Sequence, residues 1–186
     1  MKVARSPQTA LFPCPVVLVT CIDAKGKPNI ITLAWAGVAC SNPPIISIGI
    51  RPDRYSYNLI KQSEEFAVNI PTEEYVKDTD FCGLFSGKAV DKFAETKLTP
   101  DPAEQIKPPI IRECPVNIEC IVKSLIPLGS HHLFLGEVVN VLVDESILDE
   151  KGRIDLVKAA PFTFNSGEYW SLKKKIGDIG LSKRSR

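Results

Sequence analysis

The sequence has few side chains suited to metal centres and lacks the local motifs of several enzyme classes. Histidine occurs only at His131 and His132, which are adjacent. The six cysteines include no C-x-x-C pair, so the ligand spacing of a zinc site is absent. The patterns G-x-S-x-G, G-x-x-x-x-G-K-[ST] and G-x-G-x-x-G are also missing. We therefore expect no metal, and a bound organic cofactor could explain such a chain because it brings its own reactive atoms.

Long apolar runs and an excess of charge are missing too. No stretch approaches the roughly 18 to 20 apolar residues of a membrane-spanning helix. Lys plus Arg number 23 and Asp plus Glu number 22, a net charge of +1, whereas nucleic-acid binders usually carry a strongly basic domain. We expect neither a membrane nor a nucleic-acid partner. The 186 residues predict a single domain over 1–186.

Proline, by contrast, is abundant, with 15 residues, which disfavours a helical bundle and suits a sheet with many turns. Cys21 and Cys40 fall within apolar runs, so we expect both to be buried and inert. Six reduced, buried cysteines are most simply those of a cytoplasmic protein. The basic segments 173–175 and 183–186 are expected to be solvated tails.

Short apolar runs separated by turn residues organise most of the chain. Such runs predict mostly consecutive strands, which favours a mainly β antiparallel barrel with helical insertions over a doubly wound sheet. The core is expected to span 11–143, followed by a C-terminal strand and tail over 144–186. Short helices are expected after residue 54 and within 72–87, and an ordered excursion over 87–113. The predicted strands are 16–22, 29–40, 45–50, 66–70, 116–126, 132–143 and 162–165.

Three segments combine polar, aromatic and small residues, and each has a plain structural alternative. In 29–44, small residues and a glycine would let a flat ligand approach the backbone, although a core strand and turn would look the same. In 51–58, two arginines and a serine beside a helix start could hold a phosphate, or an arginine could simply pair with Asp53. In 129–138, His131 could place a donor at a barrel mouth, or belong to a surface pair.

Taken in chain order, these segments resemble the flavin reductase-like family of FMN-binding split barrels, which includes the flavoredoxins. The resemblance covers about residues 11–143 and matches 144–186 only loosely, through 169–172. The matching features are Pro15-Val-Val-Leu-Val-Thr20, the turn with Gly26, Asn29-Ile-Ile-Thr-Leu-Ala-Trp35, Ser41-Asn-Pro-Pro44, Arg51 to Asn58, Phe66-Ala-Val-Asn-Ile-Pro71, Ser86-Gly87 with Asp91-Lys-Phe93, and Gly129 to Val138.

The resemblance implies an FMN-binding split β-barrel that forms a homodimer, with the flavin in a groove near the subunit interface. His131 occupies the family histidine position, whereas Ser130 stands where many relatives have Asp. The flavin ring and ribityl chain would be lined by Thr32, Leu33, Ala34 and Trp35, and the ring edge approached by Ser41 and Asn42. The phosphate end would be held by Arg51, Ser56 and Tyr57, and the cofactor covered by Ser86, Lys92 and Phe93.

The function implied by this resemblance is an NAD(P)H-dependent oxidoreductase of the flavin reductase type. It would take hydride from NADH or NADPH and pass electrons through FMN to free flavin, a redox partner protein or another acceptor. Flavin accepts the hydride itself, so the protein needs no general base, only donors or positive charge near N1 and O2. Lys92, His131 or a backbone amide could supply these. Two alternatives remain open: a flavoredoxin-like FMN electron carrier without NAD(P)H activity, and a non-catalytic flavin-binding dimer.

Overall fold

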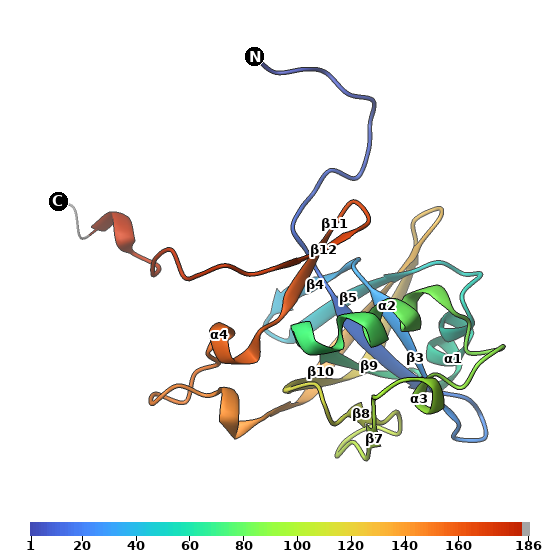
Figure 1. Ribbon diagram of the computed structural model, residues 1–186. Helices are drawn as coiled ribbons and strands as arrows, with labels where there is room; N and C mark the ends of the chain where they lie inside the picture. The colour runs from blue at the N-terminus through green and yellow to red at the C-terminus, as the bar shows by residue number, and fades with distance from the viewer. Residues whose placement is uncertain (184–186) are drawn as a thin grey trace.

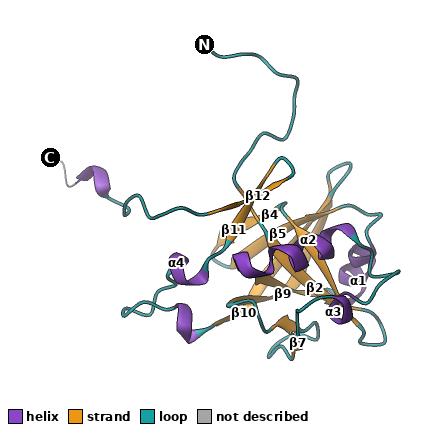
Figure 2. Cartoon of the chain, viewed as in Figure 1, coloured by secondary structure: helices purple, strands orange, loops and turns teal. Residues whose placement is uncertain are grey.

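The computed structural model describes residues 1–183, in which strands form a curled central sheet with short helices on its outside (Figure 1). Figure 2 shows how the helices lie against this sheet. Within the described residues the main sheet is seven-stranded and antiparallel, with the order β3-β2-β6-β9-β10-β5-β4. Its strands are β2 (Val17–Ile22), β3 (Pro28–Leu33), β4 (Ala36–Ser41), β5 (Pro44–Ile50), β6 (Glu65–Ile70), β9 (Val116–Pro127) and β10 (His132–Val143).

Smaller elements decorate this sheet. A three-stranded sheet consists of β1 (Cys14–Pro15), β11 (Phe162–Asn165) and β12 (Glu168–Ser171), and β7 (Pro100–Asp101) pairs with β8 (Ile110–Ile111). The α-helices are α1 (Tyr55–Ser63), α2 (Val76–Leu84), α3 (Lys92–Glu95) and α4 (Leu156–Ala159). Single 3-10 turns are η1 (Glu73–Tyr75), η2 (Glu145–Ile147) and η3 (Leu181–Lys183).

The two edge strands of the main sheet, β3 and β4, are consecutive in the chain and are joined only by Ala34 and Trp35. The amide of Gly49 in β5 donates to the carbonyl oxygen of Trp35 at 2.7 Å, so the β5 ladder continues into this link. The sheet therefore curls until its edges meet at residues 34–35, which we call the seam. This is the mainly β split barrel that the sequence predicts.

The prediction of one strand over 29–40 is wrong, because the chain leaves the β3 ladder at the seam and starts β4 at Ala36. The apolar run continues across the seam, so the break has no signature in hydrophobicity. The other predicted strands and the short helices are confirmed, with ends within about two residues. The excursion over 87–113 is ordered, as expected, and contains α3, β7 and β8.

Strand β2 shows why the barrel needs its outer elements. Val17, Val19 and Cys21 belong to the main core, because alternate side chains of a strand point to the same face. Leu18, on the other face, packs in a second core cluster with Cys82 of α2. Strand β2 is thus buried on both faces, and α2 is fixed against the outside of the barrel near the seam.

The two ends of the chain leave the barrel as extended arms (Figure 1). The expected basic tail is solvent-exposed over 173–175, and residues 184–186 lie outside the described residues. None of the helices in residues 1–183 has the length and apolar composition of a membrane-spanning segment. Cys21 is buried as predicted, but the prediction that all six cysteines are buried is wrong for Cys14 and Cys40. Cys40 is half-exposed because it lies near the tip of the β4–β5 hairpin.

Candidate functional site

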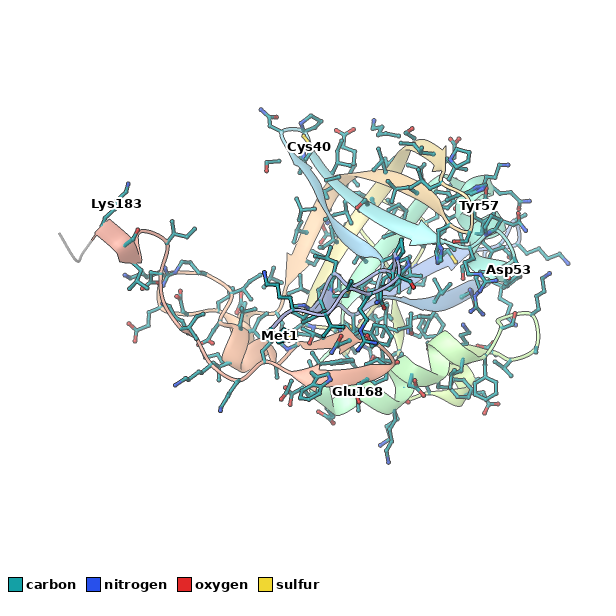
Figure 3. The ribbon with its side chains drawn as sticks, turned by 90° about the horizontal axis from the view of Figure 1, so that it is seen from above. Met1, Cys40, Asp53, Tyr57, Glu168 and Lys183 are labelled. Atoms are coloured by element: carbon teal, nitrogen blue, oxygen red, sulfur yellow. The ribbon has the colours of Figure 1, made fainter. Side chains whose placement is uncertain are left out.

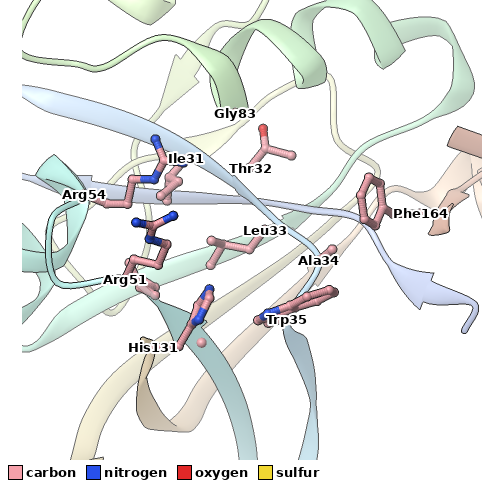
Figure 4. Close-up of a pocket in the computed structure, with 12 residues that line it drawn as sticks. Ile31, Thr32, Leu33, Ala34, Trp35, Arg51, Arg54, Gly83, His131 and Phe164 are labelled. Carbon is pink, nitrogen blue, oxygen red and sulfur yellow. The ribbon is translucent and has the colours of Figure 1, made fainter. Parts of the chain in front are cut away.

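A continuous groove runs along the barrel beside the seam. It consists of a first cavity of about 200 Å³ and a second of about 120 Å³. Both cavities are lined by Ile31, Arg54 and Gly83, so they adjoin one another. Figure 4 shows the first cavity, with β3 running through it from Ile31 to the seam. The groove therefore lies where the barrel edges meet and where α2 covers them.

The groove is cationic where its two cavities adjoin. Arg51 and Arg54 both line the first cavity, and Figure 4 shows their side chains close together. Arg51 is engaged by Asp53, with Nη2 and Oδ2 3.1 Å apart, whereas Arg54 has no ion pair with any residue of 1–183. Arg54 is also the N-cap of α1, where no side chain caps the helix and no acidic residue occupies the first turn. The first amides of α1 and the Arg54 guanidinium are thus available to an anion.

Two buried polar side chains form the floor of the second cavity. Ser56, which is 2% exposed, accepts a hydrogen bond from Asn29 Nδ2 at 2.7 Å, which leaves its hydroxyl proton free. Lys92, which is 5% exposed, donates to the carbonyl oxygens of Ile30 and Cys82, each at 2.6 Å. Burial lowers the pKa of Lys92 from its ordinary value. An ammonium has three donors, so one remains for a ligand.

Gly87 controls the packing of this floor. A Cβ atom at position 87 would lie 1.9 Å from Asn29 Oδ1, so only glycine lets the 85–87 segment approach Asn29. That approach places Ser86 at the mouth of the second cavity. The Ser86-Gly87 pair that the sequence analysis singled out therefore acts through both residues, one lining the cavity and the other setting the spacing.

The first cavity becomes aromatic away from Arg54. Figure 4 shows His131 between Arg51 and Trp35, and the ring centroids of His131 and Trp35 lie 6.4 Å apart with planes tilted by 47°. The Nδ1 atom of His131 lies 3.0 Å from the hydroxyl of Ser130. Phe164 of β11 lines the same cavity, and Figure 4 places its ring away from Arg51 and Arg54. The groove therefore has a polarity, from two arginines to a group of planar rings.

The structure brings most of the predicted site residues to this groove. The first cavity is lined by Thr32, Leu33, Ala34, Trp35, Arg51 and His131, and the second by Ser56, Ser86 and Lys92. Four of the predicted residues line neither cavity: Ser41, Asn42, Tyr57 and Phe93.

Each of these four has a clear position elsewhere. Ser41 and Asn42 are exposed in the β4–β5 turn, and Figure 3 shows the neighbouring Cys40 at the far end of that hairpin from Asp53. Tyr57 is buried in the main core. Phe93 packs against the second core cluster. The structure thus assigns these side chains to turns and packing within the chain.

Other groove residues were missed by the sequence analysis. Arg54 was named in the cationic segment but was not chosen for the site, because the sequence does not show which arginine is already paired. Gly83 carried a signal, since a glycine inside a helix is unfavourable unless something packs closely. A Cβ there would lie 3.3 Å from Thr32 Cβ. Phe164 carried no signal in the sequence, because only the tertiary fold brings β11 to the seam.

The Cys82 thiol beside the groove is unreactive. Cys82 lines the second cavity, and burial raises its pKa to about 12. Burial likewise raises the pKa of Cys21 to about 11. Both remain protonated at neutral pH and are poor nucleophiles, as predicted for Cys21. Across residues 1–183 no three His, Cys, Asp or Glu side chains are grouped to hold a metal ion.

The fold and the groove place the chain in a class, that of split-barrel proteins with a ligand groove at the seam. The family model described as "Flavin reductase like domain" matches residues 9–173. The chain belongs to this family, which confirms the resemblance found in the sequence and supports a flavin-related redox function.

Solved structures and curated sequences agree with this membership. The flavoredoxin of Desulfovibrio vulgaris (Miyazaki F) is 36% identical with a TM-score of 0.93, over 98% of this chain and 100% of that chain. The flavoredoxin from Methanosarcina acetivorans is 29% identical with a TM-score of 0.90, over 100% and 98%. An uncharacterized protein of Archaeoglobus fulgidus is 33% identical over 145 residues, which is 78% of this chain and 81% of that protein.

Proposed function

We propose that this protein is an FMN-binding oxidoreductase that passes hydride or electrons from NADH or NADPH to free flavin or another acceptor. The polarity of the groove carries the proposal: Arg54, which has no ion pair within residues 1–183, lies where the cavities adjoin, and Trp35 and Phe164 line the far side of the first cavity. FMN has the same polarity, with a phosphate at one end and a planar ring system at the other. The family membership is the independent support for a flavin ligand.

The cationic end fits a phosphate group. Arg54 can form a two-pronged contact with phosphate oxygens, and Tyr55 and Ser56, the first two residues of α1, line the adjoining second cavity. Ser56 has a hydroxyl proton to donate, and Lys92 has one ammonium proton left after its two backbone contacts. Ser56 and Lys92 are already buried and held by neighbours, so binding would order little of these two side chains that is not already ordered.

The ring end supplies contact and a hydrogen-bond donor. Bound FMN would accept the hydride at its own N5 atom, so the chain needs no general base. Of the two side chains among the donors that the sequence left open, Lys92 lies with Ser56 in the second cavity, whereas His131 lines the first cavity beside Trp35. We therefore assign Lys92 to the phosphate end and His131 to the catalytic role, stabilising negative charge on the reduced ring.

A flavoredoxin-like electron carrier without NAD(P)H activity is the second candidate. It is favoured by the 36% identity to the Desulfovibrio vulgaris flavoredoxin. The two candidates differ in one reaction: only the oxidoreductase is reduced by a pyridine nucleotide. Anaerobic mixing of the FMN-loaded protein with NADH and with NADPH separates them, because bleaching of the flavin band supports the oxidoreductase and its absence with both supports the carrier.

A homodimer in the cytoplasm remains part of this proposal. The two arms of the chain expose large apolar side chains, namely Leu11 and Phe12 at the start and Ile176 and Ile179 at the end. Apolar surface of this kind suits a protein interface, and a second copy is the commonest partner. Sedimentation of the full chain beside a variant with Leu11 and Phe12 replaced by serine tests it, with a lower dimer fraction expected for the variant.

The deciding experiment is to load the purified protein with FMN, remove the excess by gel filtration and record the visible spectrum. A retained and shifted flavin band supports flavin binding, and a colourless protein overturns both redox candidates. Arg54→Ala is the matched variant and Lys61→Ala its control, because Lys61 lies in the last turn of the same helix, away from the groove. We expect retention to fall for the first and to stay unchanged for the second.

A further inference from the structure

The β11–β12 hairpin reaches the groove from outside the barrel sheet. It pairs with β1 instead of with the main sheet, and its base is tied to the chain before α2 by the amide of Glu73, which donates to the Ala160 carbonyl at 2.9 Å. Phe164 is the residue of this hairpin that lines the first cavity. Its ring forms part of the aromatic end, although the hairpin lies more than a hundred residues from the seam in sequence.

A single side-chain hydrogen bond fixes the hairpin against α2. The hydroxyl of Tyr169 donates to Asp80 Oδ1 at 2.9 Å. The Tyr169 ring also meets Phe164 edge-on, with centroids 6.0 Å apart, and Phe162 in the same way at 5.6 Å. Tyr169 therefore lies between the helix and the ring that lines the cavity.

The helix end of this bond is itself tied to the groove. The side-chain hydroxyl of Thr32 in β3 donates to the Thr79 carbonyl of α2, directly before Asp80. Gly83, one turn further along α2, lines both cavities. Helix α2 thus contacts β3 on one side and Tyr169 on the other, so the Asp80–Tyr169 bond connects two walls of the groove.

We propose that Phe164 contacts the ring of the bound flavin and that Tyr169 and Asp80 are positioning residues that hold it there. An aromatic side chain held at a fixed angle offers a planar ligand a shaped contact without further loss of side-chain freedom. This inference rests on the proposed function for the identity of the ligand. Its structural half, the fixing of the hairpin by Asp80, does not.

The test uses the two tryptophans. Trp170→Phe leaves Trp35 as the only tryptophan, so quenching of its fluorescence reports FMN binding at the ring end. Trp170 is also the matched control, because its indole lies on the same strand as Tyr169 but donates to Glu168 within the hairpin. We expect Trp170→Phe to bind FMN as the natural chain does.

In this background, Tyr169→Phe and Asp80→Ala should each weaken FMN binding by about 5- to 10-fold, the size of one lost hydrogen bond. Asp80→Asn keeps an acceptor and should stay within about twofold of the background. The double variant of Tyr169 and Asp80 should be no weaker than either single one, because both remove the same bond. Phe164→Leu should weaken binding while leaving the Asp80 bond in place. Unchanged FMN affinity in Phe164→Leu overturns the contact.

Hydrogen exchange on the FMN-free protein separates this inference from the proposed function. Tyr169→Phe and Asp80→Ala should speed amide exchange over 163–170, and Trp170→Phe should not. Unchanged exchange in the first two variants overturns the positioning role, whatever the ligand. If the natural chain binds no FMN, the proposed function and the Phe164 contact fail together, and the exchange result still decides how the hairpin is held.

Discussion

The hydroxyl of Tyr57 lies 2.8 Å from Nδ1 of His132, and their rings meet edge-on with centroids 5.3 Å apart. His131, the preceding residue, lines the groove beside Trp35. The two adjacent histidines therefore face different surroundings, one the core and the other the ligand site. Two residues that are indistinguishable by type in the sequence are separated by the alternation of side chains at the start of β10.

Removing the Tyr57 hydroxyl should affect stability and spare ligand binding. Tyr57→Phe leaves His132 without its partner and should lower the free energy of unfolding by about 1 to 2 kcal/mol. FMN affinity should not change, because Tyr57 lines neither cavity. Urea denaturation and FMN titration measure the two effects. His131→Ala is the reciprocal variant, for which we expect near-normal stability and slower flavin reduction. Weaker FMN binding in Tyr57→Phe would contradict the placement of Tyr57 in the core.

The two arginines should contribute unequally to FMN binding. Arg54→Ala should weaken it by about 10- to 100-fold, as expected for the loss of a charge-assisted contact to phosphate. Arg51→Ala should cost less, because Asp53 already engages Arg51. Asp53→Asn should then strengthen binding by releasing Arg51. Fluorescence titrations at low and high salt measure the FMN affinity of all three variants. A larger loss of affinity in Arg51→Ala than in Arg54→Ala would contradict this order.

A methyl group at position 87 should disrupt the phosphate end. Gly87→Ala places a Cβ atom on Asn29, which must move and lose its hydrogen bond to Ser56. We expect the free energy of unfolding to fall by about 1 to 3 kcal/mol, as for an overpacked interior, and FMN retention to fall with it. Gly37→Ala is the control, because a Cβ at position 37 meets nothing within 4 Å. Equal effects of the two substitutions would contradict this account.

The cysteines should divide into two reactive and four unreactive thiols. Cys14 and Cys40 are half-exposed, whereas the other four are buried. Burial raises the pKa of Cys120 to about 12 and also raises the pKa of Cys114, in line with Cys21 and Cys82. A thiol reagent at pH 8 should therefore modify two groups rapidly in the native protein and six after unfolding. Rapid modification of a third would show that one of the buried sites opens.

Tyr169 should make the protein sensitive to alkali. Burial, with the hydrogen bond to Asp80, raises the pKa of Tyr169 to about 12. In the unfolded chain a tyrosine ionises near pH 10, at about its ordinary pKa. The stabilising effect is therefore complete below about pH 10 and is lost as pH rises toward 12. Melting temperatures of the natural chain and Tyr169→Phe should differ at pH 8 and converge between pH 10 and 12; a constant difference would contradict this.

The strands were predictable because local patterning determines them. Apolar runs bounded by Gly, Pro and Asp turns predicted five of the seven barrel strands as one run each, and the other two, β3 and β4, as parts of a single run over 29–40. The unbroken apolar character of β2 reflects its two buried faces. The seam was not predictable, because residues 29–40 remain apolar across Ala34 and Trp35. What breaks the strand is a long-range contact, the bond from the Gly49 amide to Trp35.

The candidate site was predictable where its residues are contiguous. Residues 32 and 33 end strand β3 and 34–35 follow directly, while 51–56 lead into the start of α1, so each set reaches the groove through neighbours in sequence. Ser56 and Tyr57 show the limit, since neighbours on a helix turn about 100° apart, and only Ser56 faces the groove. Phe164 is brought in by the hairpin, and no local signal marks it.

Lys92 also helps to prevent strand pairing between two copies of the folded chain. Strand β3 is an edge of the main sheet, and an exposed edge offers unpaired backbone groups to which a strand of another molecule can add. The Lys92 ammonium donates a hydrogen bond to the Ile30 carbonyl on this edge, and α2 packs against β3. The lysine at the phosphate end thus also blocks strand addition, so Lys92→Met should leave the protein prone to aggregate through an uncovered sheet edge.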